Sequence, residues 1–173
     1  MLIAAKQLHR CSVEGTDGAV GTVKDLLFDG RLWKIRYFDV DTGQWLPGRR
    51  VILSPGAIQA VDYAARTLTT PLTTEQVENS PPLESDLPVS RQKEVELAQY
   101  YAWGVYWSSI EAAREESEEE GDPNLRSTRN VSGYHILATD GEIGHVDDFI
   151  IDDADWDIRY LVVDTRNWLP GRK

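Results

Sequence analysis

The 173-residue chain is poor in cysteine, in long uncharged runs and in clustered basic residues. Its single cysteine, Cys11, excludes an internal disulfide framework and fits a reducing compartment, so we expect a cytoplasmic protein. The longest uncharged stretch of the aromatic-rich centre, Leu97–Ile110, is too short to cross a hydrocarbon core of about 30 Å. The N-terminal residues MLIAAKQLHR also lack the pattern of a signal peptide. We therefore expect no membrane insertion.

Acidic residues outnumber basic residues by 29 to 18, and the excess lies in one segment. Glu75–Asp122 carries thirteen acids and three bases, a net charge of −10, whereas the rest of the chain has a net charge of −1. Nucleic-acid phosphates are bound by clustered Lys and Arg, and no such cluster is present in the sequence. The charge pattern therefore argues against nucleic acid as a partner. The hydrophobic content of 41% is nevertheless sufficient for a globular core.

The sequence contains no nucleophile elbow, phosphate-binding loop or dinucleotide fingerprint. The three histidines, His9, His135 and His145, lack the spacing of metal ligands. Two matched aspartate pairs, Asp25 with Asp148 and Asp41 with Asp164, are candidate paired carboxylates, although strand ends and turns commonly use Asp. The sequence therefore predicts a protein that is not an enzyme and has no cofactor.

An acidic run near the C-terminus partly matches a calcium-binding loop. Asp153, Asp155 and Asp157 alternate as the first ligands of such a loop do, and Asp164 occupies the twelfth position. Ile158, however, stands where the sharp turn of the loop requires glycine. We therefore interpret the run as a polar hairpin tip and predict no metal site.

An internal repeat organises the chain. Asp17–Arg50 and Asp140–Lys173 align without a gap at an offset of 123, and 18 of 34 positions are identical. Such a match points to a duplicated module joined by an unrelated acidic segment. Turn-forming and core-forming residues dominate the matched positions: Gly18, Gly21, Trp33, Tyr37, Trp45, Pro47 and Gly48 in the first copy, and Gly141, Gly144, Trp156, Tyr160, Trp168, Pro170 and Gly171 in the second.

The matched residues predict short strands and tight turns. Leu-Pro-Gly-Arg at 46–49 and 169–172 fits a type II turn, in which Gly supplies the positive φ. Residues 33–40 read as a strand, with Trp33, Ile35 and Tyr37 on one face and Arg36, Phe38 and Val40 on the other. We predict further strands at 51–53, 58–62 and 67–70, with a 3₁₀ element at 54–57. Together these elements suggest a small barrel or sandwich, and a closed barrel would remove exposed strand edges.

The segments DGAVGTVKDLLFDG and WKIRYFDVDTGQWLPGRRVILSP, with their copies in the second half, resemble the PRC-barrel family. This is the β-barrel domain of the cytoplasmic part of the photosynthetic reaction-centre H subunit, and it is also found in a ribosome-maturation factor. The resemblance covers about residues 1–72 and 125–173. It implies a small β-barrel that acts as a protein-interaction or adaptor module, with no catalytic residues to carry over. The chain has neither the transmembrane anchor of the first relative nor the RNA-associated domain of the second.

We predict a mainly β fold with three segments: a first PRC-type module at 1–72, an acidic helical linker at 73–122 and a second, truncated module at 123–173. The second copy stops at Lys173, where the first copy still has strands to come. About fifty residues bury too little surface to be stable alone. We therefore expect that the chain is cut from a longer one or that another surface, such as a second copy in a homodimer, completes the module.

The linker carries the candidate binding residues. Ser90 is expected to cap a helix running from Arg91 towards Trp107. Five aromatic residues there are candidates for binding a partner or ligand: Tyr100, Tyr101, Trp103, Tyr106 and Trp107. The alternative is that these rings cover a barrel or join the two modules, because stripes at helical spacing are usually core. The six glutamates of Glu111–Glu120 are expected to form a solvated helix end, with an acidic tether as the alternative.

Two functions from different classes follow from these features. The first is a non-enzymatic interaction module that presents edges, loops or the aromatic helix to a protein partner. The second is a binder of a small ligand or ion in a groove beside the aromatic helix, which a pocket near Tyr101, Trp103 or Trp107 would favour. A ribosome-associated role is a third alternative, by family analogy alone.

Overall fold

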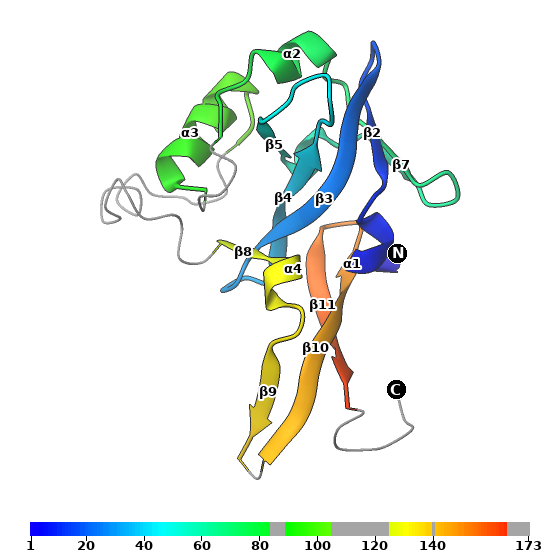
Figure 1. The fold of residues 1–173 in the computed structure, drawn as a ribbon, viewed down its shortest axis with the longest axis vertical. Coiled ribbons are helices and arrows are strands. Elements are labelled where there is room, and N and C mark those ends of the chain that lie inside the picture. Colours follow the sequence, from blue (N-terminus) through cyan, green and yellow to red (C-terminus); the bar gives the residue numbers. More distant parts are fainter. Residues whose placement is uncertain (84–88, 105–124, 140, 166–173) are drawn as a thin grey trace.

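The computed structural model describes residues 1–83, 89–104, 125–139 and 141–165, and this part of the chain is mainly β (Figure 1). In chain order the elements are β1 (Leu2–Ala4), α1 (Ala5–Leu8), β2 (Ser12–Glu14), β3 (Ala19–Asp29), β4 (Lys34–Asp41), β5 (Arg50–Leu53), η1 (Pro55–Ala57), β6 (Ala60–Asp62), β7 (Thr67–Thr69), α2 (Thr74–Glu78), α3 (Arg91–Tyr100), β8 (Leu125–Ser127), α4 (Thr128–Val131), β9 (His135–Ala138), β10 (Gly141–Asp152) and β11 (Asp157–Asp164). No helix among these is long and apolar enough to cross a membrane.

All eleven strands join one sheet. Its main path runs β1-β10-β11-β4-β3-β2-β7-β6, with β5 added to β4, β8 to β3 and β9 to β10. The strands at the two ends of this path do not pair, so the sheet is not closed into a barrel. The closed barrel predicted for the first copy is therefore wrong. The physical reason is that β4 and β1 pair with β11 and β10, so that strands far apart in sequence extend one another's sheet.

Elements that lie 123 residues apart have the same type and order. β1, α1 and β4 correspond in this way to β8, α4 and β11, and in each pair both the first and the last residues differ by 123. We call β1–β4 with α1 the N-terminal set, and β8–β11 with α4 the C-terminal set. Each set gives its first strand to the other set: β1 pairs with β10, and β8 pairs with β3. The registers also match, because Leu2 lies opposite Asp152 and Leu125 lies opposite Asp29.

The two sets meet where β4 and β11 begin. Lys34 pairs with Asp157, its own counterpart at the offset of 123, and an ion pair of 2.6 Å joins their side chains. Ile35 N donates to Trp156 O at 2.9 Å, and Ile158 N donates to Trp33 O at 2.7 Å. Both tryptophans adopt positive φ, 53° for Trp33 and 64° for Trp156, at the turn before each strand. Trp33 thus ends a turn and is not part of the strand predicted for it.

The core lies on both faces of β4. The larger cluster includes Ile35, Phe38 and Val40, and a second cluster places Tyr37 with residues of β5 and α3. The predicted grouping of Ile35 with Tyr37 is wrong, because the register with β3 shifts between these two residues. A bulge of this kind moves the following side chains to the opposite face.

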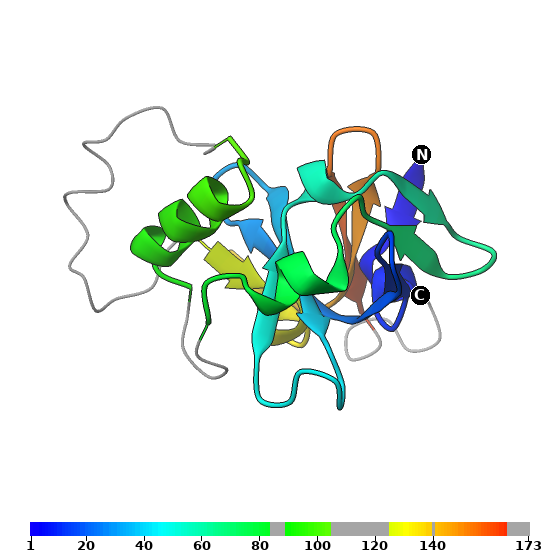
Figure 2. The same ribbon diagram turned by 90° about the horizontal axis from the view of Figure 1, so that it is seen from above.

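Helix α3 packs beside β4 and β5, away from α1 and the N-terminus (Figure 2), whereas Val77 of α2 lies in the larger cluster. α3 begins after the Ser90 cap, as predicted, but it ends at Tyr100 and not near Trp107. Ala102 takes a positive φ of 55° just beyond this end, which stops the helix. In contrast, β9, β10 and β11 project away from these helices (Figure 1).

Local predictions within the first copy agree closely with the structure. The segments predicted at 51–53, 54–57 and 67–70 correspond to β5, η1 and β7. Gly48 has a φ of 76°, and Arg49 N donates to Leu46 O at 3.4 Å, as the predicted type II turn requires. The matching turn of the second copy, with Trp168, Pro170 and Gly171, lies outside the described residues.

Replacing Ile35 or Ile158 with alanine tests the central packing. Both side chains are buried in the larger cluster, so each variant should lose about 2–5 kcal/mol of the free energy of unfolding, measured in urea. Leu137→Ala, at a side chain that is 76% exposed, is the control and should change stability by less than about 0.5 kcal/mol. A loss this small at both isoleucines would contradict the assigned core.

Candidate functional site

Three of the five predicted aromatic residues form a cluster at the end of α3. Tyr101 stacks on Trp103 with a centroid distance of 4.3 Å and meets Tyr100 edge-on at 4.9 Å. Tyr100 is exposed and donates its hydroxyl hydrogen to Gln76 O at 2.9 Å. Tyr101 packs against both core clusters, and burial raises the pKa of its hydroxyl. The other two candidates, Tyr106 and Trp107, lie outside the described residues.

A cavity of about 340 Å³ opens beside this cluster. Four parts of the chain form its walls: the end of α3, η1, the first residues of β4 and the turn between β10 and β11. Trp103 and Trp156 provide two indole rings, and Trp156 is held edge-on to Phe38 at 5.0 Å. Lys34, Arg36 and Asp155 supply the charged groups of the lining. The cavity therefore combines aromatic walls with a few polar groups, as small-molecule sites do.

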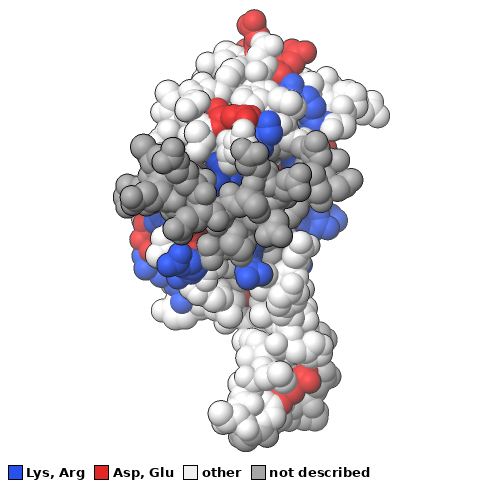
Figure 3. Space-filling view, turned by 90° about the vertical axis from the view of Figure 1, so that its left-hand side faces the viewer, with Lys and Arg blue, Asp and Glu red and all other residues white. Residues whose placement is uncertain are grey.

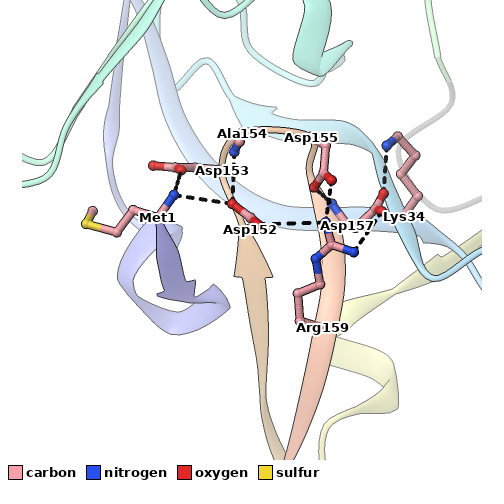
Figure 4. Close-up of polar contacts among 8 residues, drawn as sticks. All are labelled: Met1, Lys34, Asp152, Asp153, Ala154, Asp155, Asp157 and Arg159. Carbon is pink, nitrogen blue, oxygen red and sulfur yellow. Dashed lines mark hydrogen bonds and ion pairs between the residues drawn. The ribbon is translucent and has the colours of Figure 1, made fainter.

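The charged groups around this cavity are neutralised locally. Lys34 pairs with Asp157 at 2.6 Å, and Arg36 lies 3.6 Å from Asp29. Arg159 contacts Asp155 and lies 3.3 Å from Asp157 (Figure 4). Because both signs are present and paired, the lining offers no strong field to attract a highly charged ligand.

Figure 4 also shows the residues that had partly matched a calcium-binding loop. Asp152 accepts from Ala154 N at 3.2 Å and, together with Asp153, contacts the amino group of Met1. Arg159 forms an ion pair with Asp155, so these carboxylates of the turn are paired with cationic groups of the chain itself. Among the described residues, no group of three His, Cys, Asp or Glu side chains is arranged to hold a metal ion.

The matched aspartates Asp25 and Asp148 hold the exchanged segments. Asp25 accepts hydrogen bonds from the hydroxyls of Ser127 and Thr128 and, at 3.2 Å, from Arg129 N at the start of α4. Asp148 accepts from Lys6 N in α1 at 3.3 Å. Each carboxylate thus caps the short helix that the other set contributes. These contacts give both repeated aspartates a structural role.

A second, smaller cavity of about 230 Å³ lies between α1 and α4. His9 lines it, and His9 Nε2 lies 3.4 Å from Thr128 Oγ1, which donates to Asp25 Oδ1 at 2.9 Å. Burial lowers the pKa of His9, and the neighbouring Arg129 and Lys6 act in the same direction, against Asp25 and Asp148. The ring therefore favours its neutral form where the two sets meet.

The projecting strands expose apolar surface that the sequence did not indicate. We call the described residues 134–139, 141–146 and 160–163 the lobe. Tyr160 is 62% exposed, whereas its repeat counterpart Tyr37 is 6% exposed. Leu161 is also exposed, whereas its counterpart Phe38 is fully buried. Tyr160 was predicted as a packing residue of the repeat, and in the described chain it is not covered. The signal in the sequence was the repeat alignment, which matches Tyr160 with Tyr37 and Leu161 with Phe38.

Comparison with models of known protein families matches the PRC-barrel domain over residues 2–77 and 123–173. The two matched ranges contain both strand sets and exclude the centre of the acidic segment. A search for relatives among curated proteins returns no match.

The lowered pKa of His9 predicts a pH-dependent stability. The unfolded chain binds a proton near the ordinary pKa of 6.5, before the native state does. The free energy of unfolding therefore has its maximal contribution from His9 above about pH 6.5. This contribution decreases as the pH drops towards the lower native pKa of His9. His9→Gln should reduce the loss measured by urea unfolding between pH 7.5 and pH 5.5.

His135→Gln, at an exposed histidine of the lobe, is the matched control and should keep the full wild-type loss. An equal loss in the wild type and in His9→Gln would refute the assignment to His9.

Proposed function

Because the chain belongs to the PRC-barrel family, a kind of domain that serves protein interaction, we propose that it is a non-enzymatic adaptor that binds protein through its lobe. The family is generally non-enzymatic. Asp25 and Asp148, one of the two matched pairs considered as candidate paired carboxylates, serve as helix caps. The proposal therefore rests on the exposed surface of the lobe and not on reactive side chains.

The proposed architecture is two modules, at 1–72 and 123–173, joined by the acidic segment 73–122. The support is the order of the elements, which repeats at an offset of 123, together with the exchanged first strands. In this arrangement the modules differ in what covers them. The first module has β5, β6 and β7 in addition to the shared elements, and α3 packs on its outer face.

The observation that carries the proposal is the contrast between β4 and β11. β5 pairs with β4 from Phe38 to Asp41, and Leu97 of α3 packs in one cluster with Tyr37. Along Tyr160–Val163 of β11, no described strand pairs with the outer edge. Exposed apolar patches and open strand edges are typical places for protein binding.

The second candidate function is binding of a small aromatic molecule in the cavity beside α3. The specific observation in its favour is the pair of indoles, Trp103 and Trp156, on the wall of a cavity of about 340 Å³. Because the charged groups there are paired, stacking and apolar contact would supply most of the affinity.

Capture of partners tests the adaptor proposal. The immobilised full chain is incubated with extract of its source cell, and captured proteins, including native copies of the chain, are identified by mass spectrometry. Leu161→Lys should reduce capture to background, because it places a charge on the apolar surface. Leu32→Lys is the matched control, since Leu32 is 64% exposed and lies outside the lobe. Capture by Leu161→Lys equal to that by the wild type would refute the proposal.

Titration with 8-anilinonaphthalene-1-sulfonate tests the cavity. The dye should bind the wild type with increased fluorescence, and Trp103→Ala should lose at least tenfold in affinity. Trp45→Ala is the control, because Trp45 is 40% exposed and does not line the cavity. If Trp103→Ala binds the dye as the wild type does, the cavity is not the site.

A further inference from the structure

We propose that the surface bound by the lobe is a second copy of the same chain, paired strand to strand along β11. This inference rests on the proposed function and names its partner. The two sheets would join in an antiparallel pair related by a two-fold axis at Val162, so that Leu161–Val163 of one copy lies against Leu161–Val163 of the other.

The apolar edge of β11 requires a strand that covers it. Val162 and Val163 are half-buried, and Tyr160 and Leu161 are exposed, along an edge with no described strand partner. An open apolar edge of this kind invites unspecific pairing unless it is covered. In β4, the corresponding edge is covered by β5, from Phe38 opposite Leu53 to Asp41 opposite Arg50.

The second step is the chemistry of the covering strand. Asp39 of β4 is buried and accepts a hydrogen bond from Arg50 Nε at 3.0 Å, so the strand beside β4 must carry a cation. At the matching position β11 has Val162, and the run Tyr-Leu-Val-Val at 160–163 has no charge. The strand that fits beside β11 is therefore apolar, and Tyr160–Val163 itself meets this requirement.

The third step is electrostatic. The whole chain carries a net charge of −11, which would oppose association of two copies if it were evenly spread. The excess lies in Glu75–Asp122, however, and the lobe has few charged side chains. Among the lobe residues the acidic and basic side chains are Glu142, His135 and His145, and Glu142 lies 2.6 Å from His135. Figure 3 shows this part of the molecule as almost uncharged on the face drawn.

A two-fold antiparallel pair places one residue opposite its own copy. An axis at Val162, for example, sets Leu161 of each copy opposite Val163 of the other, which matches apolar side chains on one face of the joined sheet. The resulting contact is isologous and closed at this edge. It therefore predicts a dimer and not an open-ended fibre.

Light scattering after size exclusion tests this arrangement on the full chain. The wild type should give twice the chain mass of 19.5 kDa at about 100 μM and move towards 19.5 kDa on dilution. Val162→Asp should give the monomer mass at the same concentration, because two like charges would face each other. Val162 is half-buried on an edge with no described strand partner, so the variant should keep its fold, which far-UV circular dichroism checks. Leu137→Asp, on β9 of the same lobe, should remain dimeric.

A cysteine test gives the position of the axis. In a Cys11→Ser background, Leu161→Cys or Val162→Cys should form a disulfide-linked dimer on mild oxidation, since facing strand residues lie about 4.5–5.5 Å apart at Cα. Leu137→Cys is the control and should stay unlinked. A dimer that survives Val162→Asp, or the absence of any link at 161 and 162, would overturn the strand pairing.

The result also separates this inference from the adaptor proposal. A wild type that is monomeric at every concentration but still captures another protein through Leu161 overturns the dimer and leaves the adaptor proposal in place. The same holds if a segment of the chain itself covers β11. A monomer that captures nothing overturns both.

Discussion

The exchange of first strands between the two sets is the constraint on which the rest of the structure depends. β1 completes the edge of β10, β8 completes the edge of β3, and Asp25 and Asp148 cap the helices that follow these strands. With these segments in place, the tips of β4 and β11 pair at Lys34 and Asp157. That pairing places the turn carrying Trp156 in the wall of the larger cavity, which the end of α3 also lines. A sheet built in this way is continuous across both sets and does not close into a barrel within either set.

Features set by neighbouring residues could be predicted from the sequence, and features set by pairing could not. The type II turn at Gly48 and the strands that became β5 and β7 depend on local backbone preference. Which side chains of β4 share a face depends on a bulge near Arg36. Pairing with β3 fixes this bulge, and the two-residue alternation of the sequence does not reveal it. The exchange itself is carried by three-residue strands, LIA and LRS, which share only their leucine. In the site, Tyr101 and Trp103 were predicted by their aromatic clustering, whereas Lys34 and Asp155 come from segments distant in sequence.

The exposed lobe and the larger cavity lie where matching positions of the repeat have different surroundings. Tyr37 and Tyr160 are the same residue at the same place in the repeat, but α3 and β5 cover only the first. Trp33 packs beside Phe28, whereas Trp156 reaches the cavity under Trp103. A repeated sequence thus provides the scaffold, and the segments outside the repeat decide which of its faces remain accessible.

The exchanged strands also set an order of events during synthesis. Leu27–Asp29 of β3 pairs with Leu125–Ser127, about 100 residues later in the chain. At about 5–20 residues per second, translation needs roughly 5–20 s to deliver that strand after β3 has been made. During this interval Asp25 has no helix to cap, and one edge of the nascent sheet faces the solvent or a chaperone. The acidic segment, which emerges in the same interval, adds negative charge that keeps growing chains apart while they wait.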